Sequence, residues 1–210
     1  MLHLIDIHKT YAKREIIRIP SIYFYKGIYM IKGANGTGKT TLLKIIAGLI
    51  PFDGDIIYDE ISIRKQPAAY RNLVSWAMAA PLFPEFVRGQ DLINLYSSIR
   101  KVNKSEADEL ITLFNMQAYV HLATGAYSSG MMKKLAIVLA LIGKMPLIIL
   151  DEPFITLDKE TIPILCSLIS DWHLQYEISF IVSSHLEQEN LFQMPYRQLA
   201  VSDQTLHFLP

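Results

Sequence analysis

The sequence predicts an α/β protein in which a sheet core carries an inserted helical segment. Short apolar runs typical of buried parallel strands stand at residues 147–150 and 179–184. Between them, residues 161–176 have helical spacing, as the crossover between two parallel strands requires. The middle of the chain, residues 82–145, also has apolar residues at helical rather than strand spacing. Strand-like segments therefore flank a helical insertion.

The N-terminal region is predicted to be rich in β-structure. Apolar runs at residues 2–7 and 14–20 are joined by a polar connection, which favours two paired strands. Residues 22–33 are β-branched and aromatic, and we expect one strand that runs directly into a glycine-rich loop. A helix is expected from Thr40 onward, and residues 51–63 favour a turn followed by a hairpin.

Three helices are predicted in the inserted segment, at residues 89–101, 105–116 and 131–142. Ser105 is expected to cap the second of them. The third follows residues 126–130, "AYSSG", whose serines and glycine suit a loop that leads into a helix N-terminus.

Composition narrows the class of protein. The 210 residues are 51% hydrophobic and carry 20 basic and 20 acidic side chains, so no basic field favours nucleic acid as a partner. Cys166 is the single cysteine, which excludes a disulfide framework and favours a reducing compartment. The N-terminus does not look like a signal peptide, and the longest apolar run, Leu135–Gly143, is far too short to span a membrane. We expect a soluble, cytosolic chain.

Residues 33–40, "GANGTGKT", match the phosphate-binding loop pattern G-x-x-x-x-G-K-[ST]. Glycines let successive backbone N–H groups turn toward one anion, and the following helix presents its positive end to it. A glycine-rich turn without a ligand is the alternative, but the strand-like run before it and the helix after it favour a nucleoside triphosphate. Lys39 would reach the β- and γ-phosphates, Thr40 would hold Mg²⁺, and Thr41 would contact the α-phosphate. The predicted phosphate-binding residues are Asn35, Gly36, Thr37, Gly38, Lys39, Thr40 and Thr41.

An acidic pair follows the strand-like run at residues 147–150. Ligands bind at the carboxyl ends of strands in open α/β sheets, so we expect Asp151 in the Mg²⁺ shell and Glu152 orienting or deprotonating a water molecule. A solvated acidic pair is the alternative. His185 follows the second buried run and is a candidate γ-phosphate partner, the alternative being a structural histidine.

These residues resemble the ATP-binding cassette (ABC) family, specifically the ATPase subunit of ABC transporters, along nearly the whole chain. Gly33–Thr40 resembles the family's Walker A loop, 127–131 its signature, 147–152 its Walker B strand and 155–158 its D-loop. His185 matches the switch histidine, and Tyr11 the aromatic residue that stacks on adenine. The family's fold is a P-loop NTPase (RecA-like) core sheet with an inserted α-helical subdomain and an N-terminal antiparallel β-subdomain. The resemblance implies one ABC domain, with residues 1–81 and 146–210 as the core and 82–145 as the helical subdomain.

The resemblance also implies how the chain works. Two ATPase subunits, identical or different, would dimerise head to tail on ATP and Mg²⁺, with Ser128, Ser129 and Gly130 capping the partner's γ-phosphate and Asp158 in the D-loop. They would drive a separate transmembrane permease, by this signature an exporter, from the cytoplasmic face of the membrane. A soluble ABC ATPase without a transport role is the main alternative, and a small-molecule P-loop kinase is a more distant one.

Two departures from the family pattern stand out. In the signature, Ser129 replaces a glycine and Met131 replaces a glutamine, while Ser128 and Gly130 are kept. The second departure is the absence of the family's Q-loop glutamine, because Met78, Ala79 and Ala80 occupy its region and Gln90 is expected to open the next helix. Slow basal hydrolysis, or coupling through other contacts, would follow.

The apolar segment that follows, "PLFPEF", has two interpretations. Exposed Leu82, Phe83 and Phe86 would favour a groove that receives a short helix of the permease. The alternative is packing of these side chains against the helical subdomain.

Overall fold

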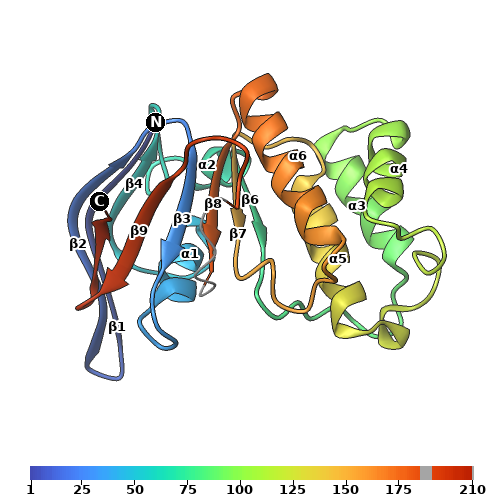
Figure 1. Ribbon diagram of the computed structural model, residues 1–210. Helices are drawn as coiled ribbons and strands as arrows, with labels where there is room; N and C mark the ends of the chain where they lie inside the picture. The colour runs from blue at the N-terminus through green and yellow to red at the C-terminus, as the bar shows by residue number, and fades with distance from the viewer. Residues whose placement is uncertain (185–190, 210) are drawn as a thin grey trace.

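The computed structural model describes residues 1–184 and 191–209, which form two sheets with helices between and beside them (Figure 1). The smaller sheet is antiparallel, with strand order β2-β1-β4-β5. β1 and β2 are joined by a tight turn in which Ala12 and Lys13 have φ of 45° and 70°. The strands of this sheet are β1 (Leu2–Tyr11), β2 (Arg14–Phe24), β4 (Asp53–Tyr58) and β5 (Ile61–Ser62).

The larger sheet has six strands in the order β10-β9-β3-β8-β7-β6, parallel throughout except for β10. Its strands are β3 (Ile28–Lys32), β6 (Val74–Ala77), β7 (Leu147–Leu150), β8 (Ser179–Ser183), β9 (Arg197–Ser202) and β10 (Thr205–Phe208). Alternate β7 residues serve two cores: Leu147 and Ile149 pack toward the antiparallel sheet, Ile148 and Leu150 toward the helices. Burial on both faces explains why this strand is wholly apolar.

Helices cover both faces of the larger sheet. α1 (Lys39–Ile46) packs in the core between the two sheets, and the short α2 (Pro67–Arg71) lies near β5 and β6. α6 (Thr161–Tyr176) covers the opposite face (Figure 1). This is the crossover helix that the sequence predicts, with the same bounds.

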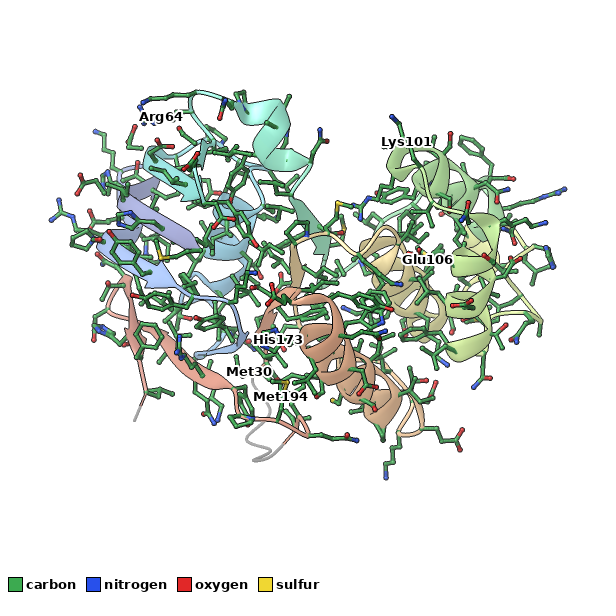
Figure 2. All side chains as sticks on the ribbon, turned by 90° about the horizontal axis from the view of Figure 1, so that it is seen from above. Met30, Arg64, Lys101, Glu106, His173 and Met194 are labelled. Atoms are coloured by element: carbon green, nitrogen blue, oxygen red, sulfur yellow. The ribbon has the colours of Figure 1, made fainter. Side chains whose placement is uncertain are left out.

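The remaining helices follow β6 and precede β7, so the helical part is an insertion between two neighbouring strands of the sheet. It comprises α3 (Gly89–Arg100), α4 (Lys104–Leu113), the 3₁₀ turn Thr124–Ala126 and α5 (Ser129–Leu141). Lys101 and Glu106 mark this part in Figure 2, at the end of the molecule away from Arg64 near the antiparallel sheet. Within the described residues, no helix is both long and apolar enough to cross a membrane.

The structure corrects two details of the sequence prediction. Residues 22–33 are not one strand: β2 ends at Phe24 in the antiparallel sheet, and β3 starts at Ile28 in the parallel sheet. Ser105 is not the cap of α4, because the helix starts one residue earlier and Asn103 occupies the N-cap position. Four further elements, α2, β6, β9 and β10, are not among those predicted from the sequence.

Candidate ATP-binding site

The glycine-rich loop connects β3 to α1 at the carboxyl edge of the parallel sheet. Gly36 and Gly38 have φ of 82° and 104°, a region that side chains with a Cβ atom rarely adopt. Lys39 opens α1, and its Nζ donates to the carbonyl oxygens of Gly33, at 2.7 Å, and Ala34, at 3.2 Å. The lysine therefore lies folded over the loop that the sequence predicts to bind phosphate.

A buried polar network joins this loop to the acidic pair. Thr40 Oγ1 donates to Asp151 Oδ2 at 2.8 Å, and Ser183 Oγ donates to Asp151 Oδ1 at 2.6 Å. Asp151 is 1% exposed. Thr40 and Asp151 are hard oxygen donors within hydrogen-bond distance of each other, which fits a Mg²⁺ site completed by water and phosphate oxygens.

Glu152 is held in an unusual backbone conformation beside this network. Its φ is 46°, in the left-handed region, and the residue is 9% exposed. Its backbone N–H donates to Ser183 Oγ at 2.9 Å, and its carbonyl accepts from Lys133 Nζ at 3.1 Å. The Glu152 carboxylate lies 3.7 Å from Lys39 Nζ, so the acidic side chain is directed at the phosphate loop.

The phosphate loop and Glu152 line one cavity of about 400 Å³. Tyr11 contributes to it from the end of β1 with a half-exposed ring, and Ala79 contributes from the segment after β6. The cavity is lined by Tyr11, Ile16, Asn35, Gly36, Gly38, Lys39, Thr40, Thr41, Ala79 and Glu152. The structure thus brings together the predicted phosphate loop, the acidic residue and the predicted adenine-stacking tyrosine.

The signature residues stand apart from this cavity. Ser128 is the N-cap of α5, and its Oγ accepts a hydrogen bond from the Met131 N–H at 3.2 Å. A Cβ atom on Gly130 would lie 2.8 Å from the Thr156 carbonyl oxygen, so the position requires glycine. Ser128, Ser129 and Gly130 are not among the described residues that line the cavity.

Asp158, the predicted D-loop aspartate, contacts α5 of its own chain, the helix that follows the predicted signature. Asp158 accepts from Lys134 Nζ at 2.7 Å and from the Thr161 N–H at 2.8 Å. The hydrogen bonds from Lys134 and Thr161 lower the pKa of Asp158 to about 2.

Two predictions concern the absent Q-loop glutamine and His185, the predicted switch histidine. Gln90 lies in the first turn of α3 and donates to Asn94 Oδ1 at 3.0 Å, as expected of a residue that opens this helix. Ala79 occupies the cavity wall, and no amide side chain from residues 78–80 is available there. His185 lies outside the described residues.

Sequence reasoning missed Ser183 and Lys133, which fix the two ends of the Glu152 backbone. Each carries a weak signal. Ser183 is a polar residue at the end of a wholly buried strand, and Lys133 is 2% exposed in a largely buried helix.

A P-loop at the carboxyl edge of a parallel sheet, with a buried aspartate bonded to its threonine, defines a P-loop NTPase. A family model described as "ABC transporter" matches residues 21–155, and the chain belongs to this family: it is an ABC ATPase subunit.

Individual relatives agree with this assignment. The cytochrome c biogenesis ATP-binding export protein CcmA of Haemophilus influenzae is 32% identical over 181 residues, 84% of this chain and 84% of CcmA. The ABC transporter ATP-binding protein YtrB of Bacillus subtilis is 28% identical over 190 residues, 88% of this chain but only 63% of YtrB. The dimeric post-hydrolysis structure of the ATP-binding cassette MJ0796 with ADP and Pi has a TM-score of 0.84 at 18% identity, covering 100% of this chain and 99% of that one. This last likeness establishes the fold: a P-loop NTPase core sheet with a helical insertion and an antiparallel β-part.

Proposed function

We propose that two copies of this chain, or this chain and a similar one, form a head-to-tail dimer that holds ATP between the P-loop of one subunit and residues 128–130 of the other. The observation that carries the proposal is that residues 128–130 do not line the P-loop cavity of their own chain. The cap at Ser128–Gly130 forms a helix N-terminus, which favours an anion, yet it does not line its own chain's P-loop cavity. Ser128 and Ser129 are exposed, so a partner's γ-phosphate can reach them.

Within each half-site the residues take distinct roles. Lys39 exchanges its two loop carbonyls for the β- and γ-phosphate oxygens, and Tyr11 stacks on adenine. Thr40 and Asp151 would hold Mg²⁺, which when bound offsets the charge of the phosphates. Glu152 orients or deprotonates the attacking water. His185 completes the proposed set as γ-phosphate partner.

The cavity wall formed by Ala79 supports slow basal hydrolysis. A glutamine there would place an amide near the Mg²⁺ and the attacking water, whereas the methyl group of Ala79 offers no hydrogen bond. Ala79→Gln is therefore expected to raise kcat about tenfold or more. An ordinary ATPase rate that Ala79→Gln leaves unchanged would remove this part of the proposal.

A groove of about 300 Å³ supports docking of a separate membrane permease. It lies between the proposed core (1–81 and 146–210) and the proposed helical subdomain (82–145), and its lining includes Leu49, Met78 and Phe83. Leu82 and Phe86, which are close to Phe83 in the sequence, are 85% and 84% exposed, which is unusual for side chains of this size. Phe83 differs, because its side chain packs against the hydrophobic core on the helical side of the larger sheet and also lines the groove.

The proposed cellular role follows from this docking. The subunit works at the cytoplasmic face of the membrane, held there by its permease. The methionine-containing signature and the similarity to CcmA, an export protein by name, support export as the direction. Leu82→Ser with Phe86→Ser is expected to abolish co-purification with the permease and to leave soluble ATP hydrolysis within about twofold of wild type.

A mixing experiment tests the shared site. Lys39→Ala removes the P-loop contact and Gly130→Asp removes the cap, so each variant alone forms no intact site. In a head-to-tail heterodimer of the two variants, one site combines an intact P-loop with an intact cap, while the other combines both defects. ATPase activity that appears only on mixing is expected. A mixture as inactive as its components would contradict the proposal.

A further inference from the structure

Lys133 is a buried cation whose role the proposed chemistry does not include. It lies in the second turn of α5 and is 2% exposed. Its Nζ donates to the carbonyl oxygens of Met78 at 3.3 Å and Glu152 at 3.1 Å, and also to that of Ala79. An ammonium group has three N–H donors, so these three carbonyls use all of them.

This arrangement is costly, and stability alone does not explain it. Removing an ammonium group from water is unfavourable, and burial accordingly lowers the pKa of Lys133, while the charges of Asp151 and Glu152 act in the opposite direction. A methionine would fill a similar volume without this penalty, and buried ionic groups can often be replaced by apolar ones at no loss of stability. We therefore expect the contacts of the Lys133 ammonium group to serve function rather than stability.

One of the three contacts of Lys133 is to the backbone carbonyl of Glu152. A left-handed φ is unfavourable at a residue with a Cβ atom, so the surrounding structure must enforce the φ of 46° at Glu152. Ser183 binds the Glu152 N–H from β8, and Lys133 binds the Glu152 carbonyl from α5. The peptide groups on both sides of Glu152 Cα are thus fixed by side chains from two different elements, which sets the direction in which the Glu152 side chain leaves the backbone.

The same ammonium also holds the segment after β6. Met78 and Ala79 occupy the region where the family has its Q-loop glutamine, and their backbone carbonyls bind Lys133 instead. One side chain thereby joins the helical insertion, this segment and the turn that carries Glu152.

We propose that Lys133 is a positioning residue for ATP hydrolysis, which acts by holding the Glu152 backbone and the Met78–Ala79 segment against the signature helix. The inference rests on the proposed role of Glu152 in activating water. Lys133, a residue of α5, thereby controls the position of the Glu152 carboxylate. A displacement of α5 is then transmitted to Glu152 through the Lys133 ammonium group.

Lys133→Met in the full chain tests the proposal, with the exposed Lys104→Met in the same helical part as the control. We expect kcat to fall about 10- to 100-fold while KM for ATP changes by less than about threefold, because misplacement of the base affects the chemical step rather than nucleotide binding. Lys104→Met is expected to keep both constants within about twofold. A Lys133→Met kcat within twofold of wild type, or a loss confined to KM, would overturn the proposal.

A double-mutant cycle with Glu152→Gln separates positioning from general structural damage. If Lys133 acts through Glu152, Lys133→Met lowers the residual single-turnover rate of Glu152→Gln by less than about twofold. The same fold-loss in both backgrounds would refute this role. If Glu152→Gln alone leaves turnover unchanged, the proposed role of Glu152 itself is wrong. This outcome is distinguishable from a failure of the Lys133 proposal.

Lys133→Gln serves if Lys133→Met does not fold. The glutamine side chain is shorter, and its amide nitrogen has two N–H donors rather than three. We therefore expect kcat to fall about 3- to 10-fold. In the Glu152→Gln background, Lys133→Gln should again cause little further loss. Wild-type turnover in soluble Lys133→Gln would overturn the proposal.

Discussion

Ser183→Ala is expected to destabilise the protein and to slow ATP hydrolysis together. Ser183 is fully buried at the end of β8, and its hydroxyl serves two groups of the site. It donates to Asp151 Oδ1 at 2.6 Å and accepts from the Glu152 N–H at 2.9 Å. Alanine removes both bonds and leaves both partners in place.

The magnitude follows from the character of the two bonds. A hydrogen bond to a buried carboxylate contributes about 1.5–3 kcal/mol, and an unpaired buried N–H costs about 1–3 kcal/mol. Because partial relaxation offsets some of this, we expect a loss of roughly 3 kcal/mol in the free energy of unfolding. For a chain of this size that corresponds to a decrease in Tm of about 6–12 °C.

Ser170→Ala is the matched control. Ser170 is also buried, but its hydroxyl donates only to the Cys166 carbonyl one turn earlier in α6, at 3.0 Å. Its loss should cost about 1 kcal/mol or less and leave kcat unchanged. Urea unfolding and steady-state ATPase assays on both variants give the comparison. Equal effects of the two substitutions on stability, or a Ser183→Ala enzyme with wild-type kcat, would refute the reasoning.

Two further predictions concern Asp158 and Tyr11. The folded pKa of Asp158, about 2, lies below its unfolded value of 3.8, so its pairing adds stability above about pH 4 that is lost as pH falls toward 2. Lys134→Met removes the largest cause, so urea unfolding between about pH 5 and pH 2 should show a smaller loss of stability than in wild type; an identical pH dependence would contradict this role for Lys134. Tyr11→Ala is expected to weaken ATP binding about tenfold and Tyr11→Phe by less than twofold, measured by equilibrium titration, since stacking needs the ring and not the hydroxyl. Unchanged affinity in Tyr11→Ala would exclude adenine stacking.

The elements that the sequence predicted best are those with a complete local signal. The crossover helix α6 has apolar periodicity along its whole length, and β7 is an uninterrupted apolar run. By contrast, β6 is four residues of mixed character, and its place at the sheet edge comes from pairing with β7, which lies some seventy positions further along the chain. The sequence predicts one strand over residues 22–33 because the end of β2 and all of β3 are apolar and aromatic, and the turn between them is short.

The site shows the same division. The phosphate loop and the acidic pair could be recognised because each is a short pattern whose residues act together. The roles of Ser183 and Lys133 could not, because both depend on which backbone groups the fold brings to them. The carbonyls bound by Lys133 come from residues 78, 79 and 152, on two different segments. No local pattern around a lysine in α5 contains that information.

The central claim, a nucleotide site divided between two subunits, is tested most directly by the mass of Glu152→Gln in solution. Light scattering after size exclusion should give the monomer mass of 23.9 kDa without nucleotide and twice that mass with ATP and Mg²⁺. Adding Gly130→Asp to the same variant should restore the monomer while ATP binding persists. A Glu152→Gln protein that binds ATP and Mg²⁺ yet remains monomeric would contradict the account.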